Sequence, residues 1–233
     1  MRSDGSETDL GTAGGTPGFV AVALPLPQEE QARADVYGLI ARLLLAPPDD
    51  ALLASLAGAN ALVSFDSEQP LDRAWLALSQ AAREIPAAAV RDEFSELFVS
   101  TSIPKINPYG SLYLAGFLHE KPLAALRSDL AGLGLARRAG TLETEDHLGA
   151  LCETMRRMIL GGQGATRQPL VRQPLVRQQE FFEVHIATWS GLCLDHLRQA
   201  DGARFYGCVA DFIAAYFEIE REAFEVAADF EAD

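Results

Sequence analysis

The chain has 233 residues, of which 48% are hydrophobic, so one domain of ordinary size can bury an ample core and no second domain is required. Nineteen Lys and Arg residues against thirty-three Asp and Glu residues give a formal net charge of −14, which disfavours binding to nucleic acid and to anionic membranes. An acidic surface attracts basic segments. A cationic peptide partner is therefore one interpretation, and a surface that serves solubility alone is the other.

Residues 1–28 combine Gly, Ser, Thr, Pro and acidic residues, which predicts a disordered or loosely docked arm to which we assign no function. This segment lacks the basic start and apolar centre of a signal peptide, and no apolar run approaches the roughly eighteen residues of a membrane span. The three cysteines, Cys152, Cys193 and Cys208, form no CxxC motif and indicate buried thiols in a reducing compartment. We therefore expect a cytoplasmic protein.

Between residues 29 and 160, apolar residues recur at intervals of three and four, which predicts a group of helices. The first is expected from Glu29 to Leu45, where Pro47 and Pro48 stop it. Further helices are expected over residues 50–58, 71–84, 87–100, 121–135 and 146–159. These segments form the expected N-terminal helical group of the domain.

Residues 161–179 read as a linker or hinge, because they are rich in Gly, Pro and polar residues and repeat RQPLV in tandem, at 167–171 and 172–176. Residues 180–233 form the expected C-terminal helical group of the same domain, with helices over 180–197 and 203–217 and an acidic tail suited to a last helix. The hinge would let this group exchange between chains, so we expect a monomer with a domain-swapped dimer as a minority species.

No segment alternates apolar and polar residues between hairpin turns, so the predicted fold class is all-α, a single helical domain of roughly ten helices. His185 and His196 are about three helical turns apart, too far to share one metal ion. No GxSxG motif, Cys–His signature or Gly-rich phosphate loop after a strand is present. We therefore predict no catalytic residue, metal or cofactor, and no motif supports nucleotide binding.

Two polar helix starts stand out. The segment NPYGSLY, residues 107–113, is a Pro-led turn that opens a helix, and ETEDH, residues 143–147, precedes the apolar stripe of the helix that ends at Ile159. Carboxylates before a helix are favoured by its unpaired N–H groups and its positive end. Capping is therefore one reading of Glu143, Glu145 and Asp146, and a ligand site is the other.

The ETEDH segment resembles the EPxDH signature of the TorD/DmsD family of redox enzyme maturation proteins, with Thr144 in place of the usual proline. The family also carries a PYxSxY-like segment upstream, which corresponds to Pro108, Tyr109, Ser111 and Tyr113 here, after a helix that ends in a Leu-Phe pair. Further departures are Asn107 and Gly110, where proline and an acidic residue are common in the family.

This resemblance implies a non-enzymatic, cytoplasmic chaperone that binds the twin-arginine leader or the apo form of a molybdenum-cofactor oxidoreductase during cofactor insertion. Formate dehydrogenase and relatives of dimethyl sulfoxide reductase are plausible clients by analogy. The competing hypothesis is a helical regulatory or scaffold module that shares the fold but has no preference for twin-arginine leaders.

An acidic, helical body with aromatic positions suits a peptide that is basic at one end and apolar at the other. Asp146 is the expected partner of a guanidinium, although a helix cap and an internal tie to the loop at Pro108 are its alternative roles. The predicted peptide-binding residues are Asp146, His147, Glu143, Tyr109, Ser111, Pro108, Tyr113, Trp75 and Tyr37.

Overall fold

The computed structural model describes residues 26–59, 68–99, 104–118, 120–137, 143–163 and 169–231. Of the predicted N-terminal arm, only residues 26–28 fall in these ranges, so the expectation for the rest of the arm lies outside the described residues. No helix within the ranges is both long and apolar enough to cross a membrane.

The described ranges contain ten α-helices, two π-helical turns and one very short hairpin, which confirms the predicted all-α domain of roughly ten helices. In chain order the elements are α1 (Gln28–Leu45), α2 (Asp50–Gly58), α3 (Pro70–Glu84), α4 (Ala87–Phe94), η2 (Ser95–Val99), α5 (Gly110–Ala115), α6 (Lys121–Gly132), α7 (Leu148–Leu160), β1 (Gly162–Gln163), β2 (Pro169–Leu170), α8 (Leu175–Phe182), η3 (Glu183–Ala187), α9 (Thr188–Gln199) and α10 (Phe205–Glu231).

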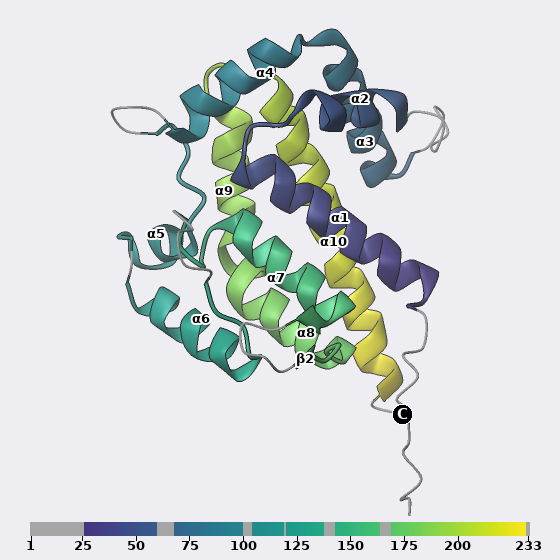
Figure 1. Cartoon of the computed structure of the whole chain (residues 1–233), viewed down its shortest axis with the longest axis vertical. Coiled ribbons are helices and arrows are strands. Elements are labelled where there is room, and N and C mark those ends of the chain that lie inside the picture. Colours follow the sequence, from purple (N-terminus) through teal and green to yellow (C-terminus); the bar gives the residue numbers. More distant parts are fainter. Residues whose placement is uncertain are drawn as a thin grey trace, which may run out of the picture.

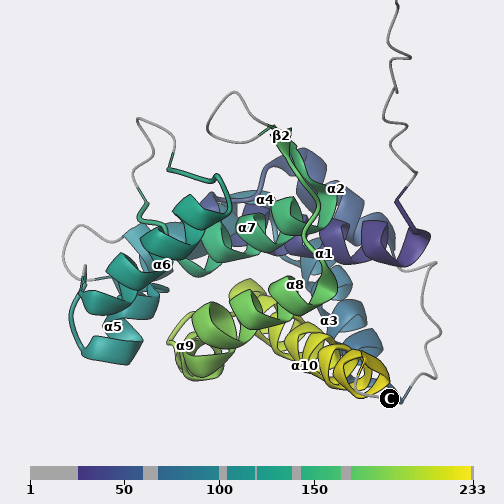
Figure 2. The ribbon, with the colours of Figure 1, turned by 90° about the horizontal axis from the view of Figure 1, so that it is seen from below.

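The helices form two layers, with α1 and α7 on one side and α9 and α10 on the other, while α5 and α6 lie together at one edge (Figures 1 and 2). Two glycines allow α1 and α7 to pack closely. A Cβ atom at Gly38 would lie 2.9 Å from Cδ of Arg156, and one at Gly149 would lie 2.8 Å from Cγ of Leu45. Helix α1 therefore packs tightly against α7 and supports its start.

The long helix α10 is fixed to the rest of the domain by two buried carboxylates. Glu220 accepts hydrogen bonds from the Arg33 guanidinium at 2.8 and 2.7 Å and from the Tyr37 hydroxyl at 3.0 Å, which ties α10 to α1. Glu93 of α4 accepts from the backbone N–H groups of Phe205 and Tyr206 at 3.1 and 2.7 Å. A carboxylate from a distant helix thus satisfies the first N–H groups of α10.

The structure corrects several predicted boundaries. The helix expected from Glu180 begins at Leu175, within the predicted linker 161–179, and contains the π-helical turn η3. The helix expected over 87–100 is divided into α4 and η2, and the acidic tail continues α10 to Glu231 instead of forming a separate helix. The division into two groups joined by a hinge remains a prediction.

The described parts of the duplicated pentapeptide differ in conformation. In the first copy, Pro169 and Leu170 form β2, which pairs antiparallel with β1, and Leu170 is buried. In the second copy, Pro174 is the N-cap of α8 and Leu175 is its first residue. The Pro-Leu pair of the repeat therefore lies in a strand in the first copy and at a helix start in the second.

Candidate functional site

The two polar helix starts lie side by side, and their backbones are joined. The Gly110 N–H donates to the Asp146 carbonyl at 2.9 Å, and the Leu148 N–H donates to the Pro108 carbonyl at 2.8 Å. These bonds form an antiparallel bridge between Tyr109 and His147. We call residues 108–111 and 143–148, which connect α5 to α7, the α5–α7 junction.

Asp146 is the centre of this junction and is only 4% exposed. Its carboxylate accepts from the Ser111 N–H at 2.9 Å, the Ser111 hydroxyl at 2.5 Å and the Thr144 hydroxyl at 2.6 Å. Burial alone would raise the pKa of Asp146, but the hydrogen bonds from Ser111 and Thr144 outweigh it and hold that pKa below its usual value.

The hydrogen bonds of Asp146 combine two of the three roles considered for it, an internal tie to α5 and a helix cap, and contact with a ligand remains a prediction. The side chain caps the start of α5, since Ser111 is its second residue, and it does not cap α7. Thr144 occupies the position at which the EPxDH signature has proline, and its hydroxyl supplies one of the three hydrogen bonds to Asp146.

His147 is the N-cap of α7. Its Nδ1 accepts from the Gly149 N–H at 3.1 Å, so this nitrogen carries no proton, and its ring packs edge-on against Tyr109 with centroids 5.0 Å apart. Burial lowers the pKa of His147 to about 4, although the nearby Glu143 and Asp146 favour the charged form. The imidazole is therefore neutral at pH 7, and the cap predicted among the carboxylates is a histidine.

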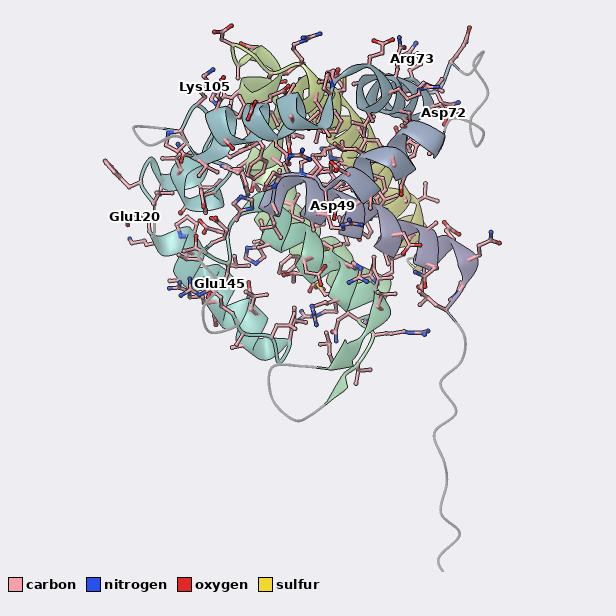
Figure 3. All side chains as sticks on the ribbon, turned by 45° about the horizontal axis from the view of Figure 1, so that its top comes forward. Asp49, Asp72, Arg73, Lys105, Glu120 and Glu145 are labelled. Atoms are coloured by element: carbon pink, nitrogen blue, oxygen red, sulfur yellow. The ribbon has the colours of Figure 1, made fainter. Side chains whose placement is uncertain are left out.

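The more accessible acidic groups of the junction are Glu143 and Glu145. The hydroxyl of half-buried Tyr109 donates to the Glu143 carboxylate, and burial together with this bond raises the pKa of Tyr109. Glu145 pairs with Arg127 of α6 at 2.9 Å. Burial opposes ionisation of Glu145, but the bond from Arg127 outweighs it and lowers the pKa. Figure 3 shows Glu145 at the same edge of the molecule as Glu120, which precedes α6.

Tyr113 lies one turn further along α5 and contacts α9. Its ring stacks on Trp189 with centroids 5.4 Å apart, and its hydroxyl lies 3.4 Å from Nδ1 of His196. Burial raises the pKa of Tyr113. The resembled family commonly has an acidic residue where this chain has Gly110. A side chain there would be crowded, because a Cβ atom would lie 3.0 Å from Nε1 of Trp189.

Two of the predicted site residues lie elsewhere. Trp75 of α3 packs on Phe212 of α10, with ring centroids 5.4 Å apart. Tyr37 has no exposed surface and packs edge-on against Tyr216. Tyr37 therefore holds α1 against α10 and is not accessible to a peptide in this conformation.

The sequence reasoning overlooked an apolar surface at the other end of α5. Leu114, Phe117 and Leu118 are exposed, Phe117 to 72%, and they surround Gly116, whose φ of 80° ends the helix. The signal in the sequence was a cluster of large apolar residues around a helix-ending glycine. A six-residue helix is about 9 Å long, so this surface and the acidic groups of the junction lie within the reach of one short peptide.

The two helix starts carry the sequence segments by which the chain resembles the TorD/DmsD family of redox enzyme maturation proteins, and a match to a family model supports that resemblance. A model of the family described as nitrate reductase delta subunit matches residues 66–195, which is more than half of the chain. The chain belongs to this TorD-like family, which is one of chaperones for molybdoenzyme maturation.

One of the similar solved structures is that of an Archaeoglobus fulgidus protein assigned provisionally as a redox enzyme maturation protein. It is 14% identical in sequence, with a TM-score of 0.48, and the match covers 88% of this chain and 98% of the other. The search of curated protein sequences gave no match.

Proposed function

We propose that this protein is a non-enzymatic, cytoplasmic chaperone that binds the twin-arginine leader, the apo form, or both, of a molybdenum-cofactor oxidoreductase before export or assembly. Membership of the maturation family supports the class of partner. One observation supports the mode of binding: the partly exposed Glu143 is joined to Tyr109, the N-cap of α5, and an exposed apolar surface lies at the other end of that helix.

The basic part of the client peptide binds at Glu143 in this proposal. The Glu143 carboxylate is partly exposed and is joined to Tyr109, whereas Asp146 is buried and already accepts three hydrogen bonds. Asp146 and Ser111 then act as positioning residues that fix the start of α5. A guanidinium that forms a charge-assisted hydrogen bond with Glu143 would contribute about 1.5–3 kcal/mol.

The apolar part of the client binds at Leu114, Phe117 and Leu118. Burying one such side chain contributes about 1.5–3 kcal/mol, so this surface supplies affinity while the acidic groups fix the register. The family description adds nitrate reductase to formate dehydrogenase and dimethyl sulfoxide reductase relatives as candidate clients. Under the competing hypothesis of a scaffold module, leaders with and without the arginine pair bind equally.

Calorimetric titration with a twin-arginine leader peptide and its Lys-Lys version tests the proposal. Glu143→Gln should weaken binding of the twin-arginine peptide by about 1.5–3 kcal/mol and flatten its salt dependence. Phe117→Ser should weaken both peptides alike. Glu218→Gln, an exposed change on α10 with the same loss of charge, is the matched control and should bind like the wild type. Equal affinity for both peptides across all folded variants would favour the scaffold module.

A further inference from the structure

A pocket of about 270 Å³ opens between α6, α7 and the turn at which α8 passes into η3. Its volume is several times the roughly 30 Å³ that one water molecule occupies in the liquid, and it approaches the lower end of the range for small-molecule sites, about 300 Å³. Its lining includes no residue of the α5–α7 junction. It is therefore a separate site, suited in size to a small organic molecule.

The inner part of the pocket is apolar. Met158 of α7 and Phe181 of α8 are buried, and Leu133, which follows α6, is half-buried. Phe181 also lies beside the imidazole of His185, with ring centroids 4.9 Å apart. A ligand that enters the pocket must therefore carry an apolar body.

Asp129 is the one carboxylate of the described pocket lining that is not paired with an Arg or Lys side chain. Arg177 and Glu180 pair with each other at 2.6 Å, so their charges compensate. Nε2 of His185 lies 2.8 Å from Oδ2 of Asp129. A neutral imidazole can donate this hydrogen bond without cancelling the charge of the carboxylate. Asp129 is 57% exposed, and a carboxylate can accept about four hydrogen bonds, so one bond to His185 uses only part of its capacity.

The backbone at His185 is fixed by a hydrogen bond from a buried side chain. The Trp189 indole N–H donates to the His185 carbonyl at 2.7 Å, and Trp189 is itself buried. His185 belongs to the π-helical turn η3, and such turns often occur at functional sites. The Trp189 hydrogen bond thus fixes the backbone that carries the His185 imidazole.

We propose that this pocket binds a small organic monocation. The apolar body lies on Leu133, Met158 and Phe181, and the charged group lies beside the Asp129 carboxylate. The face of an aromatic ring attracts a cation within about 6 Å, so Phe181 favours the same charge as Asp129 does. An anion of the same shape is repelled by Asp129.

Three probes with one aromatic body test this inference on the full chain. The cation 2-phenylethylammonium, the neutral 2-phenylethanol and the anion 3-phenylpropionate are titrated while backbone amide shifts are followed by NMR. We expect shifts centred on the pocket, with the cation bound roughly tenfold more tightly than the alcohol, which corresponds to about 1.4 kcal/mol. The anion should bind least.

Two variants separate the local charge from the charge of the whole protein. Asp129→Asn should lower the affinity for the cation to that for the alcohol, while Asp195→Asn, an exposed change on α9, should leave it unaltered. His185→Gln keeps a donor for Asp129 and should retain the preference for the cation. Equal binding of cation and alcohol, equal effects of the two Asp→Asn changes, or shifts centred away from the pocket would each overturn the proposal.

Discussion

Replacing Asp146 with asparagine should destabilise the protein, because the buried carboxylate joins α5 to α7. Asparagine keeps the shape but loses the charge. Its oxygen can still accept from Ser111, and its amino group must then face the Thr144 hydroxyl, which can rotate to accept. Hydrogen bonds to a charged group contribute about 1.5–3 kcal/mol and neutral ones about 0.5–1.5 kcal/mol. We therefore expect Asp146→Asn to lower the free energy of unfolding by about 1–2 kcal/mol.

The dependence on pH identifies the cause. The pKa of Asp146 is held below its usual value in the folded protein, so the unfolded chain binds more protons as the pH falls. The stabilisation is fully present above the ordinary Asp pKa of about 3.9 and is lost as the pH falls through the folded pKa. The difference between wild type and Asp146→Asn should therefore be constant near neutrality and narrow below about pH 4.

Thermal unfolding followed by circular dichroism measures this effect. For a chain of this size, a loss of about 1–2 kcal/mol corresponds to a fall in Tm of roughly 2–8 °C. Asp195→Asn, which changes an exposed carboxylate on α9, is the control and should shift Tm by much less. A Tm unchanged by Asp146→Asn at pH 7 would refute the role of the carboxylate as an internal tie.

Three further changes test the α5–α7 junction and the predicted hinge. The folded pKa of His147 is about 4, so the unfolded chain binds the proton first, and the wild type should lose on the order of 3 kcal/mol of stability as the pH falls from about 6.5 to about 4. His147→Gln should remove this loss. Equal pH profiles of unfolding in denaturant for the two proteins would contradict this. Gly110→Ala should lower the free energy of unfolding by about 1–3 kcal/mol, because the new Cβ crowds the Trp189 indole. An unchanged Tm and unchanged tryptophan fluorescence in this variant would show that the indole moves freely. Deleting residues 172–176 should shift the monomer to dimer ratio measured by light scattering, and an unchanged ratio would show that the segment is not the hinge.

The deletion of residues 172–176 also tests the two structures that the repeat forms. Deleting residues 172–176 gives the same sequence as deleting 167–171, because the two copies are identical. The remaining copy cannot both pair with β1 and begin α8, as the two copies do in the full chain. The shortened chain therefore loses one of two specific structures, and amide exchange would show whether the hairpin or the first turn of α8 is the less stable.

The helices were predictable because their signals are local. Apolar spacing, Pro47 with Pro48, and the Gly-rich stretch after Leu160 mark helix faces and ends within a few residues. The π-helical turns were not predictable, since apolar spacing does not distinguish η3 from the α-helices on either side. The start of α8 was missed because the duplicated RQPLV reads as a loop in both copies.

The candidate site was predictable as a place but not as a set of roles. Local sequence identified residues 108–113 and 143–147 as helix starts, and the structure brings them together. Whether Asp146 faces solvent or Ser111 depends on a contact between residues 35 positions apart, which no local pattern specifies. Tyr37 was included for its aromatic ring, yet its hydroxyl lies against Glu220, 183 positions away.

The burial of Asp146 changes how the acidic surface should be understood. A carboxylate with three internal hydrogen bonds gains little from a cationic ligand, since it would have to give up those bonds and leave Ser111 donors unsatisfied. The Glu143 carboxylate accepts a hydrogen bond from the Tyr109 hydroxyl, and Glu143 is partly exposed, so a guanidinium can join that pair without breaking it. The motif therefore combines a structural carboxylate and a carboxylate available for recognition three residues apart. Asp146→Asn should therefore lower stability without lowering selectivity for the twin-arginine leader. Glu143→Gln should lower that selectivity without lowering stability.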